Sequence, residues 1–191
     1  MRRADLLGVA GMIVALFFNM GEGWAASISW DGGGGNASWN TPANWSDDQP
    51  PASANAYTIA AVGGANTTLD ADFAVQQFTY NYAGAGSLSG GAGAPHTLSL
   101  NNGADGVVLD LRLAQNYVVS SDVSIVLGTN SSITVYGAGN AAGGNLTLAG
   151  GIAGAGCSLT KTGNGTLTLT GVNTYDGPTV ISNGIVAASN Y

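Results

Sequence analysis

The sequence contains very few residues of the types that carry most enzyme chemistry. Among its 191 residues there are one cysteine, Cys157, and one histidine, His96. A single cysteine cannot form an internal disulfide, and the chain has too few thiol and imidazole groups for a metal cluster. We expect Cys157 to fill space in the core, and His96 to be a solvated residue at a turn with no nucleophile beside it. The sequence therefore predicts no catalytic, cofactor-binding or metal site.

Charged residues are also scarce, at 8% of the chain, whereas soluble domains average about a quarter. Beyond residue 25 the basic residues are Arg112 and Lys161, and the net charge of the chain is −7. An acidic surface repels nucleic acid and anionic membranes, so neither is expected as a partner. Glycine, alanine, serine, threonine and asparagine dominate instead, which fits an exported β-repeat protein with uncharged outer faces.

Residues 1–25 predict an export signal. Two arginines precede an apolar run at residues 6–18, and the small residues Gly23 and Ala25 follow. A basic start, a short apolar core and small residues at positions −3 and −1 are typical of a secretory signal cleaved before Ala26. The run is shorter than the roughly 20 residues that span a bilayer, so a retained membrane anchor is the less favoured alternative.

A repeated strand-and-turn phrase at residues 154–187 organises the rest of the chain. In its centre leucine alternates with threonine at Leu167 and Leu169, which predicts a strand buried on its leucine side. The same alternation occurs 21 residues earlier, at Leu146 and Leu148. We expect these leucines to form two adjacent ladders that point into the core.

Further copies of the phrase are predicted on either side. A second backward step of 21 residues reaches Ile125 and Leu127, and a forward step of 19 reaches Ile185 and Val186. A unit of about 20 residues is typical of a solenoid, in which each coil buries its apolar face only against the next coil. We therefore expect residues 67–187 to form stacked parallel coils.

The same residues carry a family resemblance. Their order resembles the autotransporter-associated β-strand repeat, also called the passenger-associated transport repeat. The matching positions are Leu159, Lys161, Gly163, Gly165, Leu167, Leu169, Gly171, Asn173, Tyr175, Gly177, Thr179, Val180, Gly184 and Ile185. The resemblance implies a right-handed parallel β-helix in a secreted or surface-displayed bacterial protein. Pro178 stands where the family more often has glycine or a small polar residue, but it still suits a turn.

The middle of the chain alternates short strands with turns and shows no helical periodicity. The predicted strands are 57–62, 67–69, 75–82, 97–100, 106–113, 117–119, 123–127 and 132–136. In the third, Val75 is expected on the face opposite Phe78 and Tyr80. The glycine- and alanine-rich residues 83–95 are expected to form a loop. The fold class we expect is all-β, a right-handed parallel β-helix (solenoid), and an antiparallel β-sandwich is the alternative.

Residues 26–56 differ from the rest of the chain, because Trp30, Trp39 and Trp45 lie there among glycines and prolines. The pattern resembles the opening segment of exported bacterial proteins that carry these repeats. The first coil of a solenoid exposes an apolar end and an unpaired strand edge, and large aromatic side chains can cover both. We therefore expect an N-terminal cap. The alternative is a glycan-contact site at the three tryptophans, because flat indole faces pack on sugar rings.

A carbohydrate-cleaving β-helix is the alternative from the enzyme class. Some parallel β-helices cleave polysaccharides with carboxylates assisted by calcium or a basic residue. The candidates here are Asp105, Asp110, Asp122 and Arg112. Asp110 and Arg112 can share one strand face, and a surface ion pair explains them equally well. A groove that gathers the four residues would favour cleavage, and scattered carboxylates would not.

Taken together, these patterns predict an exported, non-enzymatic β-solenoid segment of autotransporter-passenger type that acts as a surface stalk or adhesive scaffold. Its expected parts are a signal peptide at 1–25, a tryptophan-rich cap at 26–56 and solenoid coils at 57–191, with the best repeat at 154–187. The expected partners are an outer-membrane translocator barrel encoded downstream and a cell-surface glycan or protein. The expected location is the cell surface, associated with the outer membrane, or secreted.

Overall fold

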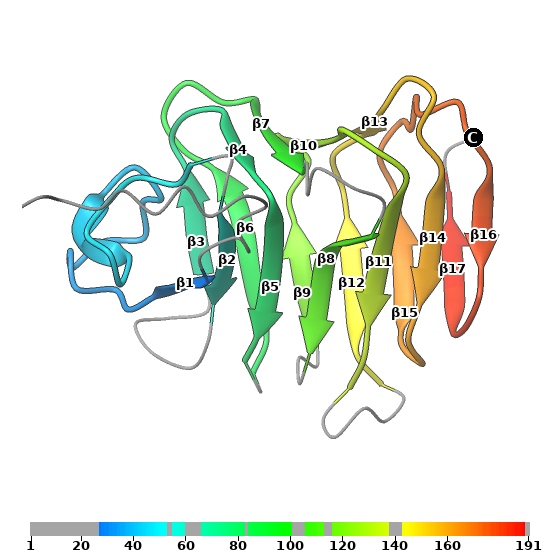
Figure 1. Cartoon of the computed structure of the whole chain (residues 1–191), viewed down its shortest axis with the longest axis horizontal. Helices are drawn as coiled ribbons and strands as arrows, with labels where there is room; N and C mark the ends of the chain where they lie inside the picture. Colours follow the sequence, from blue (N-terminus) through cyan, green and yellow to red (C-terminus); the bar gives the residue numbers. More distant parts are fainter. Residues whose placement is uncertain are drawn as a thin grey trace, which may run out of the picture.

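The computed structural model describes residues 27–52, 55–59, 66–82, 84–100, 106–112, 116–137 and 143–189. The predicted export signal and its cleavage site lie outside the described residues. In Figure 1 the strands stand side by side along the long axis of the molecule, from β1 at the N-terminal end to β16 and β17 at the C-terminal end. Each turn of the chain around this axis adds one coil to the stack.

Seventeen strands and one short 3-10 helix make up the regular structure of the described residues. The strands are β1 (Ser27–Trp30), β2 (Ala56–Ile59), β3 (Asn66–Leu69), β4 (Phe73–Val75), β5 (Gln77–Asn81), β6 (Gly86–Gly90), β7 (His96–Leu100), β8 (Gly106–Arg112), β9 (Asn116–Val119), β10 (Val123–Leu127), β11 (Ser131–Val135), β12 (Asn145–Leu148), β13 (Ile152–Ala153), β14 (Leu159–Thr162), β15 (Thr166–Leu169), β16 (Thr179–Ile181) and β17 (Ile185–Ala188). The 3-10 helix η1 is Pro42–Asn44.

The strands form three sheets that run the length of the stack. The orders are β1-β2-β5-β8-β11-β14-β16, β17-β15-β12-β9-β6-β3 and β13-β10-β7-β4. Every ladder between these strands is parallel, and successive strands of the chain pass from one sheet to another. The architecture is the parallel β-helix that the sequence predicts, and the parallel ladders exclude the antiparallel sandwich.

The C-terminal coils have the predicted register. Leu146 pairs with Leu167, and Leu167 pairs with Val186 in the following coil. Leu146, Leu148, Leu167 and Leu169 are all buried, and the threonines between them are only partly so. Burying a leucine side chain fully stabilises the fold by about 1.5–3 kcal/mol, so like-on-like stacking makes each coil depend on its neighbours.

The predicted register is wrong one coil earlier. Leu146 pairs with Tyr117 rather than with Ile125. The sequence step between the paired residues of β9 and β12 is therefore 29 residues, not 21. Ile125 lies instead on β10, in the four-stranded sheet, between Leu98 and Ile152. A coil can take in extra residues at its turns without disturbing the ladder, so the sequence step between coils is not constant.

Two other predictions fail around the N-terminal coils. Val75 and Phe78 were expected on opposite faces of one strand, but both are buried. The strand ends at Val75, and after a bend at Gln76 the chain passes from β4 in one sheet to β5 in another. The predicted loop at residues 83–95 contains β6, which pairs with β3 and β9 and buries Leu88. Glycine and serine have low strand propensity, and pairing on both edges overrides it here.

Candidate functional site

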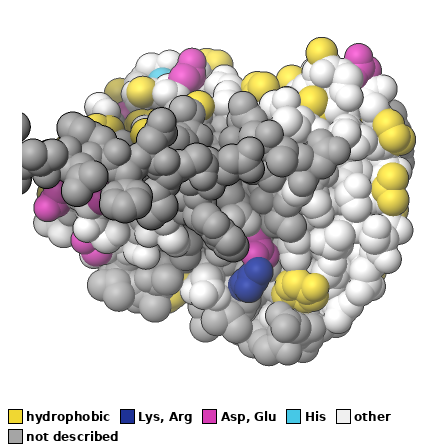
Figure 2. All heavy atoms as spheres, viewed as in Figure 1, with side chains coloured by type: hydrophobic (Ala, Val, Ile, Leu, Met, Phe, Trp, Pro, Cys, Tyr) yellow, Lys and Arg dark blue, Asp and Glu magenta, His cyan; other side chains and the backbone are white. Residues whose placement is uncertain are grey.

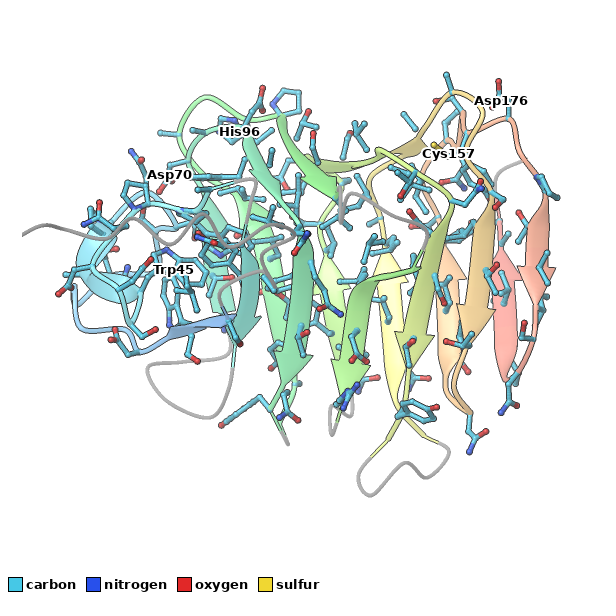
Figure 3. All side chains as sticks on the ribbon, in the orientation of Figure 1. Trp45, Asp70, His96, Cys157 and Asp176 are labelled. Carbon is cyan, nitrogen blue, oxygen red and sulfur yellow. The ribbon has the colours of Figure 1, made fainter. Side chains whose placement is uncertain are left out.

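The three tryptophans meet at the N-terminal end of the β-helix. Trp30 ends β1, and Trp45 directly follows η1. The ring of Trp45 lies edge-to-face against both others, with centroids 5.1 Å from Trp30 and 5.2 Å from Trp39. Its Nε1–H donates a 3.0 Å hydrogen bond to the carbonyl oxygen of Trp39. Figure 3 shows Trp45 within this end of the molecule.

The cluster continues into the aromatic core of the first coils. The Trp45 ring is 4.9 Å from Tyr57, and the Trp39 ring is 5.3 Å from Phe78. The exposed fractions of Trp30, Trp39 and Trp45 are 2%, 0% and 0%. Sugar stacking needs an open ring face, and these rings are enclosed by one another and by the coils. Glycan contact at the three tryptophans stays a prediction.

A buried asparagine that the sequence analysis did not single out shapes the tryptophan segment. The side chain of Asn44 donates to the carbonyl oxygens of Asn36 and Ser38, at 3.1 and 2.8 Å, and accepts from the backbone N–H of Gly34 at 3.0 Å. Asn44 is fully buried. Its position two residues after Pro42 in a polar turn was the available signal, because asparagine side chains often bond turn backbone.

Of the candidate catalytic residues, the structure brings Asp110 and Arg112 together. Arg112 Nε donates a 2.6 Å hydrogen bond to Asp110 Oδ2. The Asp110 side chain is 3% exposed and that of Arg112 is 59% exposed. Burial raises the pKa of the Asp110 carboxyl, while the hydrogen bond and charge of Arg112 act in the opposite direction. Figure 2 shows a basic side chain next to an acidic one on the face in view.

The other candidate carboxylates do not join this pair. Asp122 lies in the turn before β10 and accepts a hydrogen bond from the Ser120 hydroxyl, which lowers the pKa of its carboxyl. Asp110 belongs to the seven-stranded sheet, and β10 belongs to the four-stranded one. Asp105 lies outside the described residues. Among the described candidates, the structure shows one ion pair and one separate, hydrogen-bonded carboxylate.

The side chains of His96 and Cys157 both contact backbone carbonyl oxygens. His96 is the first residue of β7, and its side chain is only 11% exposed. Its Nδ1 lies 3.8 Å from an oxygen of Asp72, and its Nε2 lies 3.2 Å from the carbonyl oxygen of Ala92. The prediction of a solvated histidine is therefore wrong. Cys157 is buried as predicted, and its thiol donates to the carbonyl oxygen of Leu127 at 3.4 Å.

Lys161 is the buried charged group that the sequence analysis passed over. It is 0% exposed, and Nζ donates to the carbonyl oxygens of Thr162, Gly163 and Asn183 at 2.6, 2.8 and 3.2 Å. Burial lowers the pKa of its ammonium group to about 8. Its place two residues after the buried Leu159 was the available signal, because strand positions two apart share a face.

The outer faces of the coils carry uncharged polar ladders. Asn145 donates to Asn116 at 2.9 Å across β12 and β9, and the hydroxyls of Thr134 and Thr162 are 2.8 Å apart across β11 and β14. Within the described ranges, no group of three or more histidine, cysteine, aspartate or glutamate side chains could hold a metal ion. That part of the chain also contains no helix long and apolar enough to cross a membrane. The fold and these side chains define a parallel β-helix repeat protein with an aromatic N-terminal end.

Comparison with known proteins narrows this class. Residues 159–188 match the family model described as Passenger-associated-transport-repeat. The adhesin BmaC autotransporter of Brucella suis biovar 1 (strain 1330) is 42% identical over 115 residues, which cover 53% of this chain and 3% of that adhesin. No solved structure matches the chain significantly. The C-terminal coils thus carry a passenger-associated transport repeat, as the sequence resemblance implies, and the chain resembles a short segment of an autotransporter passenger.

Proposed function

We propose that this chain is a non-enzymatic structural segment of an exported passenger, acting as a surface stalk or adhesive scaffold. The observation that carries the proposal is the unbroken seven-stranded parallel ladder from β1 to β16. With strands about 4.8 Å apart, this ladder extends the molecule by roughly 29 Å. In a protein built this way each added coil lengthens the molecule, and a stalk requires such length.

The separate positions of the candidate carboxylates Asp110 and Asp122 favour a structural role over cleavage. Asp110 is held by Arg112, and Asp122 bonds Ser120 in a different part of the coil. Acid–base cleavage of a glycosidic bond needs two carboxyl groups facing one substrate, at most about 9.5 Å apart. The alternative of a carbohydrate-cleaving β-helix would need such a pair to be assembled.

The tryptophan-rich segment, proposed at residues 26–56, serves as the N-terminal cap of the solenoid. Its three indole rings are buried against the first coils, and Trp39 also lies 5.9 Å from the Phe73 ring. One buried aromatic residue removes about 150–250 Å² from water, so three of them cover an apolar coil end efficiently. β1 within this segment already belongs to the seven-stranded sheet, so the cap and the first coil are continuous.

The C-terminal coil presents open strand edges with exposed apolar side chains. β16 and β17 each pair with a strand on one side only, and they contain no charge or proline to block their free edges. Ile181 and Ile185 on these strands are 54% and 59% exposed. Such an edge is suited to pairing with a strand of another protein segment. We propose export to the cell surface with an outer-membrane translocator as partner, because the similar protein is named an autotransporter adhesin.

Display on a bacterium tests this role. The full chain is fused ahead of a translocator barrel, and its exposure is measured by externally added protease and by surface labelling. We expect a protease-resistant chain outside the cell that increases adhesion of the bacteria to a coated surface. A chain that stays inside the cell would contradict the proposal.

A parallel assay addresses the enzymatic alternative. The purified chain and its Asp110→Asn variant are incubated with a panel of neutral and acidic polysaccharides, and new chain ends are measured. We expect no products from either protein. Products that disappear in the Asp110→Asn variant would establish the carbohydrate-cleaving alternative.

A further inference from the structure

Strands β8, β11 and β14 are neighbours in the seven-stranded sheet, and their outward side chains form one polar face. Leu109 pairs with Ile133, and both side chains are buried in the core. Alternate positions along the same strands therefore point outward. The outward residues are Asp110 and Arg112 on β8, Ser132 and Thr134 on β11 with Tyr136 following it, and Thr160 and Thr162 on β14. We call this set the polar face.

A hollow of about 400 Å³ opens at the beginning of these strands. Its lining contains only hydroxyl, amide and glycine residues, namely Gly106, Asn130, Ser131, Ser132, Ser158 and Thr160. The Ser158 hydroxyl donates to Asn130 Oδ1 at 2.9 Å, and the Ser131 hydroxyl donates to the carbonyl oxygen of Thr129 at 2.8 Å. These bonds hold the polar groups in place before any ligand arrives. Ligand sites are typically about 300–1,000 Å³, so the hollow is large enough for a small polar group.

The opposite end of the polar face carries the guanidinium of Arg112, and the neighbouring strand β11 is followed there by Tyr136. Asp110 is almost wholly buried and fixes Arg112 through the 2.6 Å bond to Nε, while most of the Arg112 side chain remains exposed. The backbone of Tyr136 lies next to the end of β8, because its N–H donates to the carbonyl oxygen of Leu111 at 2.9 Å. A guanidinium offers N–H donors, and a tyrosine offers a flat ring with a hydroxyl at its edge.

We propose that the polar face binds a neutral oligosaccharide, with the hydroxyl-lined hollow and the Arg112–Tyr136 end as its two contact regions. From Ser132 to Tyr136 the strand path covers roughly 13 Å. Because Thr134 between them is only 7% exposed, a bound chain of sugar rings contacts the two ends of this path. Sugar hydroxyls both donate and accept, and the face supplies serine, threonine and asparagine groups that do the same. Asp110 is a positioning residue that orients Arg112.

The negative charge of the protein favours neutral glycans over acidic ones. With a net charge of −7, the chain repels uronic and sialic acids over distances of about 10 Å at moderate salt. In this face the single exposed cation, Arg112, is already paired with Asp110. The ligand class is therefore a neutral glycan. The inference rests on the proposed adhesive role and gives that role a binding surface.

A glycan array with neutral and sialylated oligosaccharides, probed with the full chain, tests the inference. We expect binding to neutral glycans, followed by titration calorimetry with the best binder. Ser132→Trp fills the hollow, and Arg112→Ala removes the guanidinium, so each should raise the Kd at least about tenfold. Thr147→Trp places the same bulky group on an outward position of β12 in another sheet, and it should leave the Kd unchanged.

Three results would overturn the inference: no binding on the array, binding confined to sialylated glycans, or equal Kd values for Ser132→Trp and the unchanged chain. Circular dichroism of each variant verifies that its β structure is intact. Failure here is separate from failure of the proposed function. Bacteria that display the chain and adhere without glycan binding would retain the adhesive role and reject this face as its site.

Discussion

Lys161 in β14 donates a 3.2 Å hydrogen bond from Nζ to the carbonyl oxygen of Asn183, which lies in the following coil. The same ammonium group bonds Thr162 and Gly163 in its own coil, so one buried side chain ties two coils together. A Cβ at Gly184 would lie 2.8 Å from this Nζ, and Gly184 has φ of +78°, so glycine suits this turn on both counts. The last coil is thus fixed by a polar contact as well as by the leucine ladders.

Replacing this lysine should weaken the C-terminal coils. Lys161→Met keeps an unbranched side chain, one atom shorter, but leaves three carbonyl oxygens without their donor. We expect a loss of about 1–3 kcal/mol in the free energy of unfolding, measured in urea by circular dichroism. Thr168→Met, on an outward position of β15, should change it by less than about 0.5 kcal/mol. Equal effects of the two substitutions would show that the lysine contact adds nothing.

Stability should pass through a maximum near pH 10. Burial lowers the pKa of Lys161 from 10.5 to about 8, so between these values the unfolded chain binds more protons and stability rises with pH. Burial, helped by Tyr82, raises the pKa of Tyr80 from 10.0 to about 12, so stability falls as pH rises above 10. The melting temperature should therefore increase from pH 8 to about 10 and then decrease.

Two variants separate these contributions. Lys161→Met should lose the rise below pH 10, and Tyr80→Phe should reduce the fall above it. A melting temperature that declines steadily from pH 8 in the unchanged chain would contradict the assignment of Lys161.

Placing a charge in the leucine ladder should unfold the C-terminal coils. Leu167 lies between Leu146 and Val186, and Leu167→Asp buries a carboxylate without a partner. Such a charge costs several kcal/mol, so hydrogen exchange should become fast in β12, β15 and β17. Thr168→Asp, one residue further and on the outer face, should leave exchange unchanged. Protection that persists in Leu167→Asp would disprove the coil-on-coil coupling.

Removing a tryptophan should destabilise the N-terminal coils. Trp45→Ala deletes a ring that contacts Trp30, Trp39 and Tyr57, and should cost about 3–5 kcal/mol in the free energy of unfolding. Asn40→Ala, at an exposed position of the same segment, is the matched control. Tryptophan fluorescence should stay constant when oligosaccharide is added. A saturable change in fluorescence, with no loss of stability in Trp45→Ala, would make the cluster a glycan site.

The alternation and spacing of residues in the sequence predicted much of this fold. Alternation of leucine and threonine fixes which side chains of β12 and β15 point inward, because strand side chains alternate between faces whatever the surroundings. Equal spacing then pairs Leu146 with Leu167. The parallel β-helix and the meeting of the tryptophans at its N-terminal end follow from these patterns.

Tertiary structure alone decided the features that depend on how many residues fill a turn. The sequence placed Ile125 beneath Leu146, but the coil there is longer and Tyr117 occupies that place. β6 forms in a glycine-rich stretch because strands on both sides pair with it, and no local propensity predicts that pairing. The sequence by itself determined which side chains face inward, since that follows from the backbone period. Only the folded stack decided which coils those side chains meet, because burial and backbone pairing are shared between coils.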